Sequence, residues 1–121
     1  MEWLDKAEGD FATAERELKV TTDPNYDAVC FHAQQCAEKY LKARLQESNI
    51  AFGKTHDLSL LLDMAVSIEP AWDVLRADLQ TLSTFAVAYR YPGDTAGEDD
   101  AREAVEKCKN FRQVMRRSLG L

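Results

Sequence analysis

Apolar residues recur along this chain at every third or fourth position, the spacing that places side chains on one face of an α-helix. In the first segment, Glu2–Lys19, the residues with this spacing are Leu4, Ala7, Phe11, Ala14 and Leu18. The spacing continues in four later segments, and no segment alternates polar and apolar residues as a half-buried strand does. The pattern therefore predicts five helices and no strands.

Capping residues and prolines set the expected boundaries. The second and longest helix, Asn25–Gln46, follows Asp23-Pro24, which we expect to supply its N-cap and a first-turn proline. A loop at Asn49–Lys54 separates it from a short third helix, His56–Val66. Thr55, directly before that helix, is its expected N-cap.

The last two helices are bounded by a proline and by a capping motif. The fourth carries an apolar stripe from Trp72 to Tyr89 and should end at Arg90–Gly93 (RYPG), because proline cannot continue a helix. Thr95 and Glu98 match a capping box for the fifth helix. That helix is acidic in its first turn and basic in its last, which suits the helix dipole.

Short loops between helices favour antiparallel neighbours. The predicted fold is therefore all-α: an up-and-down bundle of four long helices plus one short helix, forming a single domain over residues 1–121. If the second helix runs up, the third runs down and the fourth runs up. The C-terminal half of the second helix, the start of the third and the end of the fourth would then meet at one end of the bundle.

This arrangement would gather cationic side chains from three separate parts of the sequence. They are Lys39, Lys42, Lys54, His56 and Arg90. The N-terminus of the third helix would add free N–H groups and the positive end of its dipole. We therefore expect that end of the bundle to suit an anion such as a phosphate.

The second helix also carries a polar stripe opposite its apolar arc. Its members are His32, Gln35, Glu38, Lys39 and Lys42. Residues at these spacings are neighbours on the helix surface, so together they could bind a phosphorylated ligand. An ordinary solvated face, with Glu38 and Lys42 as a surface ion pair, explains the same pattern. The sequence leaves both interpretations open.

Charge and hydropathy narrow the class of protein. The net charge of −6 argues against a broad nucleic-acid-binding surface, although it leaves room for a local basic pocket. No apolar run is long enough to span a membrane, and the N-terminus lacks a signal-peptide core, so we expect a cytoplasmic protein without a membrane segment.

Few residues suit a metal or a cofactor. Cys30, Cys36 and Cys108 form no CxxC motif and are expected to be buried, reduced thiols. Neither histidine has a companion at ligand spacing, so no metal site is expected. The chain has no glycine-rich phosphate-binding loop and we expect no cofactor; a nucleotide would have to bind to side chains and helix ends.

Three segments resemble the signature segments of the HEPN (higher eukaryotes and prokaryotes nucleotide-binding) domain family. They are 34–43 (QQCAEKYLKA), 54–58 (KTHDL) and 90–93 (RYPG). The resemblance implies an all-α bundle that pairs as a homodimer. It also implies a minimal nucleotidyltransferase as partner, in a two-component system of the toxin–antitoxin type. Nucleotide or RNA is the ligand class that it implies.

The resemblance also raises a second function, because many members of the wider superfamily are metal-independent ribonucleases. Their active site is an arginine followed a few residues later by a histidine, at the end of the helix that corresponds to the fourth one here. Arg90 would be that arginine, whereas Thr95, Ala96 and Gly97 stand where the histidine is required.

Two hypotheses follow. In the first, a binding and regulatory protein uses Gln35, Lys39, Lys42, Lys54, His56 and Arg90 as ligand-binding residues. In the second, a ribonuclease of degenerate motif uses Arg90 and His56 as catalytic residues.

Overall fold

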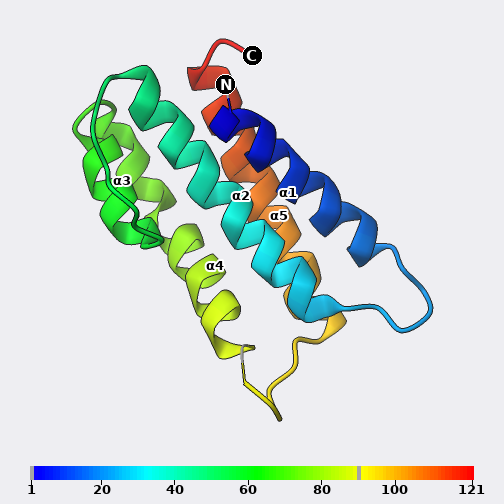
Figure 1. Ribbon diagram of the computed structural model, residues 1–121. Helices are drawn as coiled ribbons and strands as arrows, with labels where there is room; N and C mark the ends of the chain where they lie inside the picture. Colours follow the sequence, from blue (N-terminus) through cyan, green and yellow to red (C-terminus); the bar gives the residue numbers. More distant parts are fainter. Residues whose placement is uncertain (1, 90) are drawn as a thin grey trace.

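Helices account for all regular structure in the computed structural model, which describes residues 2–89 and 91–121. In chain order they are α1 (Glu2–Leu18), α2 (Tyr26–Glu47), α3 (Leu58–Val66), the 3₁₀ helix η1 (Pro70–Leu75), α4 (Arg76–Ala88) and α5 (Glu98–Ser118). The predicted all-α bundle of four long helices and one short helix is confirmed (Figure 1). No helix of the described residues is both long and apolar enough to cross a membrane.

Helix α2 lies at the centre and packs against α1, α3, α4 and α5. Its direction relative to α5 follows from contacts at both ends. The Tyr26 hydroxyl donates to Glu98 (3.3 Å) where the two helices begin, and Arg44 Nε donates to Ser118 Oγ (2.8 Å) where they end. Helices α2 and α5 are therefore parallel, and α1 runs in the opposite direction to both (Figure 1).

Helix α4 runs antiparallel to α5. Asp78, near the start of α4, contacts Lys107 in the middle of α5 (3.2 Å), and Tyr89, at the end of α4, contacts Asp100 near the start of α5 (2.9 Å). It is therefore antiparallel to α2 as well, and the prediction that the second and fourth helices share a direction is wrong. The reason is the path of the 48–57 loop, which returns along α2 instead of reversing at its end. In addition, η1 forms a separate turn ahead of α4.

The start of α3 also differs from the prediction. Asp57, and not Thr55, is its N-cap: Asp57 Oδ1 accepts hydrogen bonds from the N–H groups of Ser59 (3.0 Å) and Leu60 (3.2 Å). The Thr55 hydroxyl accepts from the N–H of Asp57 instead (3.1 Å). His56 consequently lies in the loop before the helix, where its ring reaches α2.

Two other N-caps are also displaced from the expected positions. Asn25 caps α2 by accepting from the N–H of Ala28 (3.0 Å), whereas Asp23 adopts a left-handed turn conformation with φ of 51°. For α5 the capping contact joins the N–H of Gly97 to Asp100 Oδ2 (3.1 Å), so the Thr95–Glu98 capping box is wrong by two residues. Neighbouring polar residues compete for the same free N–H groups, and sequence alone does not rank them.

The core surrounds α2 and includes the three cysteines, which are free and buried as predicted. Burial raises the pKa of the Cys30 thiol to about 12, which keeps it protonated at neutral pH. The largest side chains that are fully buried include Tyr40, Phe111 and Leu41. These contacts fix the position of α2 and hence of the polar residues that it carries.

One carboxylate links three of the helices. Glu8 on α1 receives a two-pronged contact from Arg112 on α5 (Nε 2.7 Å, Nη2 2.6 Å) and a hydrogen bond from the buried Tyr40 hydroxyl on α2. The Arg112 contact lowers the pKa of Glu8, while burial and the hydrogen bond to Glu8 raise the pKa of Tyr40 to about 12. The charged carboxylate is therefore the form that the folded state favours.

We predict that Glu8→Gln destabilises the fold at pH 7 by about 1–2 kcal/mol, because it removes charge-assisted hydrogen bonds. A lowered folded-state pKa gives stability that is present above the ordinary value of 4.5 and is lost as the pH falls below it. Urea unfolding between pH 7 and pH 3 should show a smaller acid-dependent loss in the variant. An equal loss in both proteins would contradict this role for Glu8.

Candidate functional site

Of the predicted cationic residues, Lys42 and His56 meet at the Glu38 carboxylate, whereas Lys39 pairs with Asp10 on α1. Lys39 Nζ lies 2.5 Å from Asp10 Oδ2 on α1, and Lys42 Nζ lies 3.1 Å from Glu38 Oε2 on its own helix. Both ammonium groups therefore already have a carboxylate partner. Lys54 is exposed in the loop before α3, and Arg90 lies outside the described residues.

Two other predicted residues, Gln35 and His56, line a groove of about 530 Å³. Helix α2, the segment before α3 and the last turns of α4 form this groove. Its lining residues are Phe31, Gln34, Gln35, His56, Asp57, Ser83, Ala86 and Val87. The expected meeting of the third and fourth helices does occur, but beside the first half of α2, because α4 runs antiparallel to it.

A single buried carboxylate organises the side chains at this groove. The Glu38 side chain is only 2% exposed, and its Oε2 accepts from Lys42 (3.1 Å) and from His56 Nδ1 (3.0 Å). Its Oε1 lies 3.4 Å from the Gln34 amide nitrogen and 3.5 Å from that of Gln35. Such a dense set of partners compensates the cost of burying the charge.

The interpretation of the polar stripe as a solvated face is wrong, because Lys42 and Glu38 are both buried. Rings from two other segments cover the lysine: its Nζ lies 5.0 Å from the centroid of the Trp3 ring and 5.9 Å from that of Phe52. A cation over an aromatic face is favourable, and more so when it is shielded from water. Lys42 thus acts as the internal counter-ion of Glu38.

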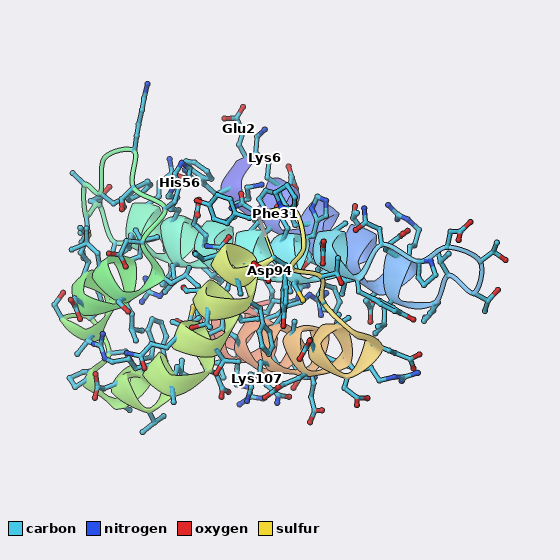
Figure 2. The ribbon with its side chains drawn as sticks, turned by 90° about the horizontal axis from the view of Figure 1, so that it is seen from below. Glu2, Lys6, Phe31, His56, Asp94 and Lys107 are labelled. Atoms are coloured by element: carbon cyan, nitrogen blue, oxygen red, sulfur yellow. The ribbon has the colours of Figure 1, made fainter. Side chains whose placement is uncertain are left out.

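One ring nitrogen of His56 is held in place, while most of the side chain is exposed to solvent. Its side chain is 77% exposed, yet Nδ1 is held by the buried Glu38 carboxylate. Because a carboxylate can only accept, Nδ1 donates to Glu38, and the Nε2 edge of the ring is left to face a ligand. Figure 2 shows His56 in the loop before α3 and Phe31 on α2, on the same side of the molecule. The ring can therefore meet a ligand in the groove.

A second carboxylate binds the other histidine, which is not a lining residue of the groove although its ring packs edge-on against Phe31. Asp10 Oδ1 lies 2.8 Å from His32 Nδ1, and the same carboxylate binds Lys39, which joins α1 to α2. Asp10 was not among the predicted residues. The burial of Asp10 could have been expected from the sequence. Asp10 follows Ala7 by three positions and precedes Ala14 by four, which places it on the apolar stripe of the first helix.

The part of the groove that the structure describes has little positive charge. Among its described lining residues there is no lysine or arginine, and the one formal charge is the carboxylate of Asp57. The sequence did not predict Phe31, Gln34 or Val87 as site residues. Which side chains line the groove depends on the direction of α4 relative to α2. In the described parts of the chain, no group of three or more potential ligands could hold a metal ion.

We predict that Lys42→Met destabilises the protein by about 3 kcal/mol or more, because it leaves the buried Glu38 carboxylate without its cation. The double variant Glu38→Gln with Lys42→Met should recover much of this loss. Urea unfolding measures both effects.

The matched control is Arg102→Met, which breaks the exposed pair with Glu98 at the same sequence spacing. Exposed pairs contribute little, so this variant should unfold almost as the parent does. Equal effects of Lys42→Met and Arg102→Met would rule out a special role for the buried pair.

Comparison with known proteins identifies one family. A family model described as HEPN domain matches residues 1–118, which include all three segments that carry the resemblance. Searches of curated proteins and of solved structures returned no match.

Proposed function

The chain belongs to the HEPN domain family, and on that premise we propose that it is a helical binding and regulatory protein, the partner of a minimal nucleotidyltransferase. Membership of the family points to a nucleotide or an RNA as its ligand class. The proposed context is a cytoplasmic two-component system of the toxin–antitoxin type. In this system the chain acts as a homodimer.

The observation that carries the proposal is the imidazole that Glu38 holds at the edge of the groove. A buried carboxylate that fixes the tautomer and orientation of an exposed histidine prepares that histidine for contact with a ligand. Here the carboxylate and its lysine are buried while His56 is open. Gln35, in the same groove, adds an amide that can hydrogen-bond to a base or a sugar.

Exposed apolar side chains support contact with other protein chains. Phe31, Val74, Val87 and Leu60 are between 42% and 83% exposed. Exposed apolar area in a small protein commonly marks an interaction site. A second copy of the chain and the transferase are the two partners that we propose for these side chains.

Arg90 is the proposed phosphate contact, on the strength of its place in the RYPG segment. The planar guanidinium fork suits phosphate oxygens. Lys54, which is exposed, is a second cation available for an RNA backbone. Lys39 and Lys42 enter the proposal only indirectly, since their carboxylate partners hold them in place.

We expect the purified protein to bind a fluorescein-labelled oligoribonucleotide of mixed sequence. His56→Gln and Arg90→Ala should each weaken binding about tenfold, because each removes one directed contact to the ligand. Fluorescence anisotropy at a fixed salt concentration measures the effect, and raising the salt should weaken binding less in Arg90→Ala than in the parent.

His32→Gln is the matched control, because His32 is also bound to a carboxylate through Nδ1 but lies outside the groove. It should bind RNA as the parent does. Undiminished binding by His56→Gln would remove the groove from the proposed function. Loss of binding in all three variants would indicate a general effect on the fold.

The alternative is a metal-independent ribonuclease. The pairing of His56 with Glu38 favours it, because a carboxylate that orients a histidine also supports general acid–base chemistry. His56 would then replace the histidine that is missing after Arg90, and Arg90 would stabilise charge at the scissile phosphate.

If this alternative holds, RNA is cleaved in the presence of a chelator, and expression of the protein arrests growth. Cleavage should fall at least a hundredfold in His56→Gln, a typical loss for a general acid or base. Gel analysis of the RNA products measures it. Intact RNA after incubation with the parent protein, together with harmless expression, would exclude the ribonuclease.

A further inference from the structure

The interior of the groove is suited to an uncharged part of a ligand. Asp57 is the only charged side chain among its described lining residues, so a phosphate placed there would be repelled. The nearby ammonium groups of Lys39 and Lys42 are directed to Asp10 and Glu38. The described lining therefore offers a phosphate no cationic partner, and an uncharged part of a ligand suits it better.

The volume of the groove and the exposed ring of Phe31 favour a planar ligand. The volume of about 530 Å³ is within the range of pockets that bind small molecules. Phe31 lines the groove and is 46% exposed, so its ring is available for stacking. Proteins that bind single-stranded nucleic acid use exposed aromatic rings in this way. A nucleobase combines the required planarity with the absence of charge.

Gln35 and Asp57 each leave a hydrogen-bond acceptor open at the groove, and the Ser83 hydroxyl there can accept as well as donate. The Gln35 amide nitrogen donates to Gln34 Oε1 (2.8 Å) and to Glu38, and among the described residues no donor reaches its carbonyl oxygen. The Oδ1 atom of Asp57 caps α3, so its Oδ2 atom remains able to accept a hydrogen bond from a ligand. Such a set selects a base edge rich in N–H groups.

We infer that the groove binds guanine, as the base of a nucleotide or of an RNA; this inference rests on the proposed function. Guanine presents its N1–H beside both hydrogens of its amino group along one edge. Adenine and cytosine present only an amino group there, and uracil only a ring N–H. A base without these N–H groups leaves acceptors of the groove unpaired. The free-energy cost of those unpaired acceptors favours guanine strongly over the other bases.

Calorimetric titration of the full chain with guanosine, adenosine, cytidine and inorganic phosphate tests the inference. Nucleosides carry no phosphate, so they report on the groove alone. Guanosine should bind about tenfold or more tightly than the other two nucleosides, and inorganic phosphate should not compete with it. Equal affinities for the three nucleosides, or competition by phosphate, would overturn the inference.

Variants locate the binding. Phe31→Ala and Gln35→Ala should each weaken guanosine binding about tenfold, the first through lost stacking and the second through a lost acceptor. Gln46→Ala is the matched control, because Gln46 is an exposed amide on α2 outside the groove. Asp57→Asn, which keeps an N-cap oxygen, should reduce the preference for guanosine over adenosine.

Two results separate this inference from the proposed function. If RNA binds but nucleosides bind without base preference, the guanine site is wrong and the proposed function stands. If neither RNA nor any nucleoside binds, both are wrong. A Phe31→Ala variant that changes the oligomeric state, with unaltered guanosine binding, would assign this groove to a second copy of the chain.

Discussion

Helix α2 contacts every other α-helix of the bundle, and this enclosure governs the rest of the structure. Because most of α2 is covered by other helices, polar side chains such as Gln34, Glu38 and Lys42 are buried on it. Buried polar groups must then find partners, because an unpaired one loses the full free energy of its hydration. In the parts of the chain that the structure describes, every buried side-chain nitrogen or oxygen has such a partner.

Three carboxylates meet this requirement, and each one joins different segments. Glu8 holds Tyr40 and Arg112, Asp10 holds His32 and Lys39, and Glu38 holds Lys42 and His56. The first two connect helices that pack side by side. The Glu38 cluster differs, since it extends from the interior of α2 to an exposed loop and ends at a side chain open to solvent. Packing within the bundle thereby determines the position of a histidine on its surface.

The helices and their number could be predicted because the spacing of apolar residues is local information. The direction of α4 could not, because it depends on the path of the 48–57 loop and on how the short α3 packs. The environment of Lys42 illustrates the same limit. Its position beside Glu38 is visible in the sequence, but its burial depends on Trp3 and Phe52, which lie far from it along the chain. His56 could be named as a site residue, whereas its partner Glu38 could be identified only once the loop was placed.

The stability of the fold does not explain why Glu38 and Lys42 are buried as a charged pair. Replacing such a pair by apolar residues of similar volume is often neutral or stabilising, since burying two charges is costly. The free-energy cost of burying the two charges is explained if the pair holds another group in place. His56 lies in a loop with most of its side chain in solvent, so its own packing cannot orient its ring. The Glu38 carboxylate, which a buried lysine holds in turn, can do so. The buried pair is therefore best understood as the support of the groove.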